Sequence, residues 1–173
     1  MMALSFDLLQ WLFPIVLTAH NLEEAIMQPG FTARHASRLR WKVGASEFRF
    51  AIVVVTIAGW AVTYLSWRGG RESVGSYLLF GCVVATLANV LVPHIPAAFV
   101  FRGYVPGLVT AVLLNLPVMW LLATLAVREG WVSGGKAVLY GVGVPLGTVA
   151  LIPGLFALGR MRRGWKAAAG EES

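Results

Sequence analysis

Residues 74–92, VGSYLLFGCVVATLANVLV, form an apolar run without a single charged side chain. A membrane-spanning helix needs roughly 20 apolar residues, because that length of helix matches the hydrocarbon core of a bilayer. The run has this length, and Pro93 and Pro96 follow it as helix-breaking signals. It therefore predicts a helix that crosses a membrane.

Similar apolar stretches lie on both sides of this run. The expected spans cover about residues 5–27, 46–67, 74–92, 105–127 and 136–158. Helix breakers lie near their ends, namely Pro29-Gly30, Gly69-Gly70 and Gly134-Gly135. We predict an all-α fold, a polytopic bundle of about five transmembrane helices. It forms one domain over residues 1–164, followed by a short polar cytoplasmic tail over residues 165–173.

The composition agrees with a membrane protein. Of the 173 residues, 58% are hydrophobic and 13% are charged, whereas a typical soluble domain is about 25% charged. The net charge of +6 does not indicate nucleic-acid binding, because the basic residues lie between the apolar runs and act as topology signals. The single cysteine, Cys82, excludes an intrachain disulfide.

The basic residues also predict the orientation, since cytoplasmic loops carry an excess of Lys and Arg. With the N-terminus outside and the C-terminus cytoplasmic, most of the 14 basic residues lie inside. The inner group is Arg34, Arg38, Arg40, Lys42, Arg49, Arg102, Arg160, Arg162, Arg163 and Lys166, and the outer group is Arg68, Arg71, Arg128 and Lys136. A re-entrant segment around Pro93 and Pro96 would break this assignment.

The first span contains the motif His20-Asn21-Leu22-Glu23-Glu24 near its end. Ionisable residues inside a membrane helix are costly and mark a functional site by default. His20 and Glu24 are four residues apart and share one helix face. Two adjacent carboxylates at a helix C-terminus need a metal ion, an arginine such as Arg102, or a bound proton beside them.

The alternating direction of the spans brings polar residues from four helices to one end of the bundle. This group comprises His20, Glu23, Glu24, Glu47, Asn89, His94, Arg102, Tyr104, Pro106, Gly107 and Thr110. The outer half of the bundle has almost nothing comparable. We therefore expect a site open toward the inner leaflet.

Two kinds of chemistry suit these residues. His and Glu at helical spacing, with a second His from another helix, are typical ligands of Zn or non-haem Fe. The candidate metal ligands are His20, Glu23, Glu24, His94 and Glu47. General acid/base catalysis by the same His and Glu side chains, without a metal, is the alternative. In both cases Asn89 and Arg102 would orient the substrate or stabilise developing negative charge.

Three of these residues also have purely structural explanations. Asn89 would simply bond a neighbouring helix. Arg102 would be a topology-determining anchor on the cytoplasmic side. Glu47 follows Ser46 at a helix start, where an acidic side chain is favoured by the helix dipole.

The order of the motifs resembles that of the HxxEE-domain family of bacterial membrane proteins. The resemblance covers about residues 11–110 and rests on His20-x-x-Glu23-Glu24, on Asn89 and His94, and on the run from Arg102 to Thr110. It implies an integral protein of the bacterial inner membrane. The family is largely uncharacterised and suspected of enzymatic function, so the resemblance supports the site and leaves the reaction open.

We expect an integral-membrane enzyme that acts on a lipid-like or apolar small molecule, with membrane lipids as its surroundings. A site at this depth reaches a lipid headgroup more easily than a soluble metabolite. The alternatives are a proton- or ion-coupled transporter that uses Glu23 and Glu24, and a non-catalytic membrane interaction protein. The sequence does not predict the oligomeric state.

Overall fold

The structure is a computed structural model that describes residues 5–38 and 43–168. Within these residues the chain is all-helical and contains no strand. Arg40 and Lys42 of the inner basic group, and residues 169–173 of the expected tail, lie outside the described residues. The elements are α1 (Phe6–Leu9), α2 (Leu12–Arg34), α3 (Ala45–Gly69), α4 (Val74–Asn89), the π-helical η1 (Val90–His94), α5 (Ile95–Phe101), α6 (Leu108–Thr110), the π-helical η2 (Ala111–Asn115), α7 (Leu116–Arg128) and α8 (Gly134–Ala168).

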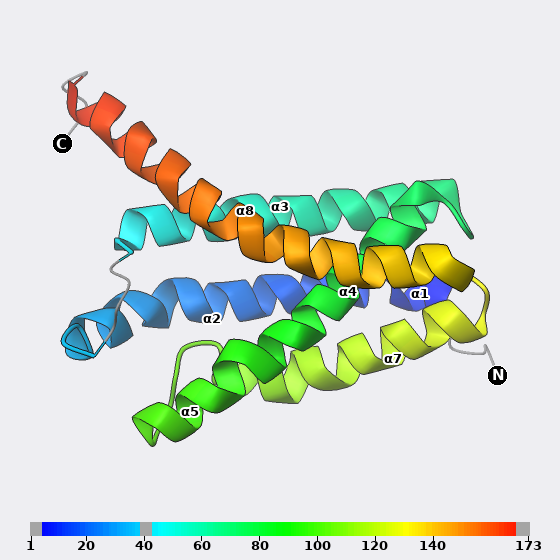
Figure 1. Cartoon of the computed structure of the whole chain (residues 1–173), viewed down its shortest axis with the longest axis horizontal. Coiled ribbons are helices and arrows are strands. Elements are labelled where there is room, and N and C mark those ends of the chain that lie inside the picture. Colours follow the sequence, from blue (N-terminus) through cyan, green and yellow to red (C-terminus); the bar gives the residue numbers. More distant parts are fainter. Residues whose placement is uncertain (1–4, 39–42, 169–173) are drawn as a thin grey trace.

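These elements form a bundle of helical rods, each made of one helix or of several consecutive ones. Successive rods run in opposite directions (Figure 1). The α2 rod runs toward the end where α5 and the last turns of α8 lie, and α3 returns from it. The α4-η1-α5 rod runs toward that end again, and α6-η2-α7 returns. Finally, α8 crosses the bundle over α4 and α3. The end that contains α5 is called the site end below.

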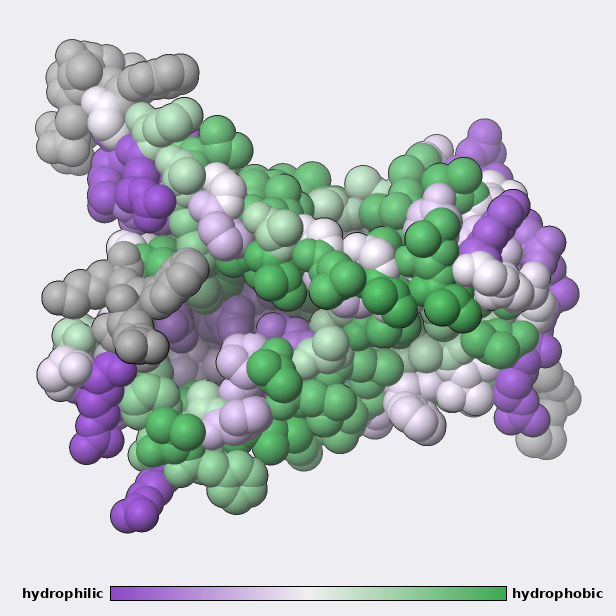
Figure 2. Space-filling model, viewed as in Figure 1, coloured by the Kyte–Doolittle hydropathy of each residue, from purple (hydrophilic) through white to green (hydrophobic). Residues whose placement is uncertain are grey.

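Four helical stretches of the described chain are long and apolar enough to cross a membrane, namely Ala45–Gly69, Val74–Phe101, Leu108–Arg128 and Gly134–Gly164. The face of the bundle shown in Figure 2 agrees, since it is hydrophobic around the middle and hydrophilic at both ends. The prediction of a polytopic membrane protein is therefore confirmed. Although α2 has the length of a span, its polar residues from His20 to Glu24 lower its mean hydropathy, and it is not among the four.

The expected end of the first helix at Pro29 is wrong, because α2 continues through Pro29 to Arg34. A proline within a helix removes the N–H that would bond the carbonyl four residues earlier. That carbonyl belongs to Ala25, and the Arg49 side chain donates to it through Nε at 3.3 Å. A side chain from the neighbouring helix thus satisfies the group that the proline leaves free.

The third rod also extends further than expected. The prolines after Val92 produce a kink at Val92, whose φ of −146° and ψ of 112° are not helical, and the chain then continues through η1 and α5 to Phe101. The fourth rod begins later than expected, at Leu108. The last helix extends to Ala168, beyond the expected domain end at residue 164.

The hydrophobic core lies in the half of the bundle opposite the site end. Phe6 of α1 packs against Trp131 with ring centroids 5.0 Å apart, and both residues join a buried cluster with Phe13, Leu79 and Met119. The Glu129 carboxylate accepts the Phe6 backbone N–H at 3.0 Å and so satisfies an orphan donor at the start of α1. Apolar side chains therefore fill the interior of one half of the bundle, and the polar residues gather in the other half.

A candidate His/Glu cation site

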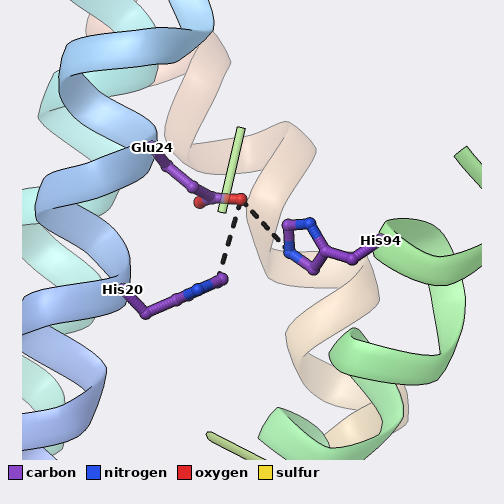
Figure 3. A group of neighbouring side chains, drawn as sticks. All are labelled: His20, Glu24 and His94. Carbon is purple, nitrogen blue, oxygen red and sulfur yellow. Dashed lines mark ion pairs between the residues drawn. The ribbon is translucent and has the colours of Figure 1, made fainter. Parts of the chain in front are cut away.

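Three side chains from two rods converge at the site end. His20 and Glu24 lie one turn apart on α2, and His94 projects toward them from η1 (Figure 3). The Glu24 Oε1 atom is 3.8 Å from His20 Nε2 and 3.4 Å from His94 Nε2. One ligand atom from each residue lies within 4.8 Å of the other two. Helical spacing explains the first pair, and the kink after Val92 supplies the third member.

The cluster is shielded from solvent. His20 is 2% exposed and His94 is 4% exposed, while the Glu24 side chain retains 19% of its accessible surface. The two imidazole rings meet edge to face, with centroids 5.0 Å apart. Among the described residues, His20 Nε2 is a buried nitrogen without a hydrogen-bond partner. Buried polar atoms are normally paired, so an unpaired nitrogen beside a carboxylate is a sign of function.

Gly107 closes the cluster from the fourth rod. Its φ of +80° is in the left-handed region, which favours glycine. A Cβ atom at this position would lie 2.7 Å from His94 Cε1, 2.8 Å from His20 Cε1 and 2.9 Å from Glu24 Cγ. The backbone before α6 therefore passes directly against all three side chains. Non-helical backbone at such depth is tolerated where it is buried in protein or lines a cavity.

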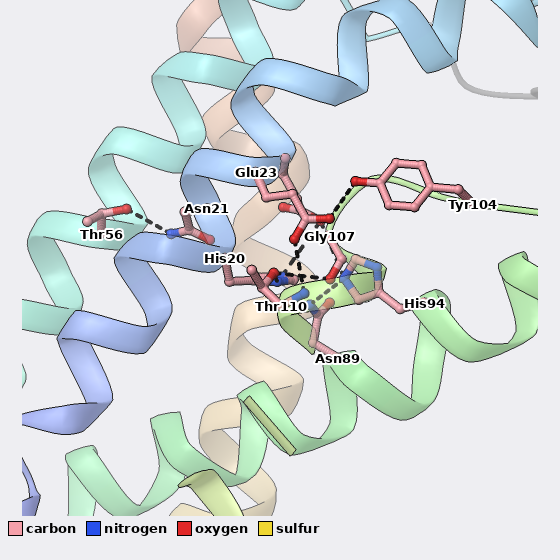
Figure 4. A network of polar contacts seen from close by, with 10 residues as sticks. His20, Asn21, Glu23, Thr56, Asn89, His94, Tyr104, Gly107 and Thr110 are labelled. Carbon is pink, nitrogen blue, oxygen red and sulfur yellow. Dashed lines mark hydrogen bonds and ion pairs between the residues drawn. The ribbon is translucent and has the colours of Figure 1, made fainter. Parts of the chain in front are cut away.

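Each histidine has a further polar contact (Figure 4). The Nδ1 atom of His20 lies 2.9 Å from the Thr110 hydroxyl oxygen. The Nε2 atom of His94 lies 3.1 Å from Asn89 Nδ2. Asn89 ends α4 one turn before His94, so the helix that delivers the second histidine also delivers its partner. The expectation that Asn89 joins His94 near the motif agrees with this geometry.

Glu23 lies beside the cluster and braces the loop before α6 (Figure 4). One carboxylate oxygen accepts the Tyr104 hydroxyl at 2.5 Å, and the other accepts the Thr110 backbone N–H at 3.0 Å. Burial, and then the hydrogen bond to Glu23, raise the pKa of Tyr104 to about 12, which keeps this phenol protonated and able to donate. Two neutral groups, the Tyr104 hydroxyl and the Thr110 N–H, thus donate to the Glu23 carboxylate. The sequence had suggested an arginine, a metal ion or a bound proton in this place.

Two predicted site residues lie elsewhere. Glu47 is buried and pairs with Arg163 of α8, and Gly159 allows the two helices to approach closely there. Arg102 is exposed at the end of α5, where its φ is +51°. The structure therefore brings His20, Glu24 and His94 together, with Asn89 and Glu23 beside them, and does not bring Glu47 or Arg102 to the cluster.

The sequence did not predict one contact of the motif itself, a hydrogen bond that holds α2 against α3. Asn21 is 6% exposed and donates through Nδ2 to the Thr56 hydroxyl of α3 at 2.7 Å. This contact ties α2 to its neighbour one residue after His20. The available signals were a second polar residue directly after His20 and a lone Thr56 among apolar residues in the middle of α3.

The region that matches known proteins contains the residues of the cluster. The family described as "Protein of unknown function with HXXEE motif" matches residues 11–122, which include the whole cluster and its braces. The chain is also similar to the uncharacterized protein YrkK of Bacillus subtilis (strain 168), with 29% identity over 147 residues. That alignment covers 85% of this chain and 92% of YrkK. No solved structure matches the chain.

Proposed function

This chain belongs to the HXXEE family, and we propose that it is an integral-membrane enzyme that acts on a lipid-like or other apolar small molecule. His20, Glu24 and His94 would hold a divalent metal ion, Zn or Fe, that polarises a polar group of the substrate. The observation that carries this proposal is the convergence of three ligand atoms within 4.8 Å in a buried site.

The spacing of Glu24 Oε1 from the two histidine nitrogens supports a metal ion. Ligands of a tetrahedral Zn site with bonds of about 2.0–2.1 Å are separated from each other by about 3.3 Å. Glu24 Oε1 lies 3.4 Å from His94 Nε2 and 3.8 Å from His20 Nε2, close to that separation. Asn89 Nδ2 contacts the same His94 Nε2 atom at 3.1 Å, so a metal ion bound there would replace that contact. Two imidazoles and one carboxylate also leave coordination positions for water or substrate, as catalytic sites require.

The surroundings of the site support an amphiphilic substrate. In Figure 2 hydrophilic residues lie in a hollow between α8 and α5, flanked by hydrophobic surface. In the same view of Figure 1, α2 lies behind that hollow. A molecule with an apolar chain and a polar group would enter laterally, keep its chain among apolar side chains and bring its polar group to α2.

A transporter gains less support from the same features. Transport requires a polar path to the opposite face of the membrane. The opposite half of the bundle is filled by the buried cluster that contains Phe13, Leu79 and Met119. Proton-coupled flux in proteoliposomes that Glu24→Gln abolishes would favour transport over catalysis. A non-catalytic interaction protein would instead keep its function in His20→Ala.

Metal analysis of protein purified without chelator tests the proposal. We expect near-stoichiometric Zn or Fe in the wild type and its loss in His20→Ala, Glu24→Gln and His94→Ala. His35→Ala is the matched control, because His35 contacts Phe31 and Phe101 and does not belong to the cluster. If no metal co-purifies, added Zn²⁺ or Fe²⁺ does not bind and chelators change nothing, the metal mechanism fails. Acid/base chemistry by a proton shared within the cluster then takes its place.

A further inference from the structure

Thr110 is the residue whose hydroxyl group contacts the Nδ1 atom of His20. Its hydroxyl oxygen lies 2.9 Å from His20 Nδ1, and the same hydroxyl donates to the Gly107 carbonyl at 3.2 Å. A hydroxyl group has one proton to donate and two lone pairs to accept with. The carbonyl oxygen can only accept, so this geometry lets the Thr110 proton point to Gly107. In that arrangement the contact with His20 is made by a lone pair of the hydroxyl oxygen.

We propose that Thr110 is a positioning residue that fixes His20 as the tautomer protonated on Nδ1, so that the lone pair on Nε2 is the cation-binding atom. The inference deepens the proposed function, and it rests on that function only where it assigns the lone pair to a cation. In metal sites the ring nitrogen opposite the metal usually donates to a fixed acceptor, and that contact sets the tautomer. Thr110 supplies this acceptor here.

The opposite tautomer fits the structure less well. It would put a proton on His20 Nε2, which is buried and lacks a hydrogen-bond partner among the described residues. The nearby Glu24 Oε1 atom is 3.8 Å away, beyond hydrogen-bond distance. Buried N–H groups without an acceptor are rarer in proteins than acceptors without a donor. A bare lone pair that faces a carboxylate instead creates a position for a cation between the two atoms.

The rest of the loop holds Thr110 in place. Glu23 accepts the Thr110 backbone N–H at 3.0 Å and the Tyr104 hydroxyl at 2.5 Å. Thr110 ends α6, a turn that follows directly on Gly107. The two adjacent carboxylates of the motif therefore have different tasks. Glu24 faces the cation position, and Glu23 fixes the residue that orients His20.

Nitrogen-15 NMR of the three histidines in the full-length protein, kept in lipid nanodiscs with chelator, tests the inference directly. His20 signals are assigned by their absence in His20→Gln. We expect a protonated Nδ1 and an unprotonated Nε2 in the wild type and in Thr110→Ser, which keeps the hydroxyl. In Thr110→Val, which removes the hydroxyl at similar volume, we expect a mixture of tautomers, with His94 signals unchanged as evidence of folding.

A proton on Nε2 of His20 in the wild type would overturn the inference, as would an unchanged tautomer in folded Thr110→Val. If Thr110→Val does not fold, the wild type and Thr110→Ser still decide. Added Zn²⁺ separates this inference from the proposed function. We expect Zn²⁺ to shift Nε2 of His20, with affinity about 10–100-fold weaker in Thr110→Val, as for other residues that orient metal ligands. If the tautomer is as expected and Zn²⁺ shifts nothing, the metal proposal fails and the assignment of the tautomer stands.

Discussion

At the scale of single residues, the site depends on the absence of a side chain at position 107. Gly107 combines a φ of +80° with close approach to both histidines and Glu24. No other residue type satisfies both conditions, because a side chain would be strained by the backbone and would collide with the cluster. A residue without functional groups thus shapes the site as much as its ligands do.

Gly107→Ala should therefore disrupt the cluster. The left-handed conformation alone costs a residue with a Cβ atom about 1–2 kcal/mol, and the new methyl group would lie under 3 Å from three side chains. We expect a lower unfolding temperature and loss of Zn²⁺ binding, measured by thermal unfolding and metal analysis. Gly103→Ala is the control, because its Cβ would meet only Phe101 O at 3.9 Å. Unchanged Zn²⁺ binding in Gly107→Ala would contradict the described geometry.

The different tasks of Glu23 and Glu24 lead to a second prediction. Glu24→Gln removes a charged ligand, so stoichiometric metal should be lost. Glu23→Gln keeps all three ligands but weakens the brace to Tyr104 and Thr110. We expect Glu23→Gln to retain one metal ion with affinity reduced about 10–100-fold. Calorimetric titration with Zn²⁺ measures both values, and equal losses in the two variants would refute the separate tasks.

At the scale of elements, the distortions of the helices are what bring the site together. The kink at Val92 turns His94 toward α2, and the loop before α6 carries Gly107 into the interior. Both π-helical segments, η1 and η2, lie at this level and contact each other. Such segments are frequent at functional sites, because an inserted residue redirects the side chains around it.

The continuation of α2 through Pro29 yields a third prediction, which belongs to this scale. Arg49 donates to the carbonyl of Ala25 that Pro29 leaves without a partner. Arg49→Met should lower the free energy of unfolding by about 1 kcal/mol, the usual contribution of one hydrogen bond. In a Pro29→Ala background the backbone N–H at position 29 can donate to Ala25, so the same substitution should cost less.

The four proteins of this double-mutant cycle can be compared by chemical unfolding in detergent micelles. Arg34→Met serves as the control, because Arg34 is an exposed arginine on α2 that makes no described hydrogen bond to the Ala25 carbonyl. Equal effects of Arg49→Met in both backgrounds would mean that Arg49 contributes through charge rather than through the Ala25 carbonyl.

At the scale of the whole molecule, the apolar runs sufficed to predict the bundle and the end at which its polar residues gather. Hydropathy can be read from the composition of each run, and consecutive spans must cross the membrane in opposite directions. The partner of Glu47 could not be predicted, because Arg163 lies 116 residues away and charged residues near helix ends carry no signal of their partner. The directions of Glu23 and Glu24 depend on the loop at Gly107, whose backbone conformation no periodicity reveals.

The orientation of the bundle in the membrane gives the last prediction. The distribution of Lys and Arg predicts that the site end faces the cytoplasm. Single cysteines in a Cys82→Ser background can test this without altering that distribution. Ser37 is exposed after α2 at the site end, and Gly135 is exposed at the start of α8 at the other end. In intact bacterial cells, a membrane-impermeant maleimide should label Gly135→Cys and leave Ser37→Cys unlabelled until the membrane is permeabilised. The reverse pattern would mean that the site end faces the outside of the cell. The cluster of His20, Glu24 and His94 would then receive its substrate from the outer leaflet.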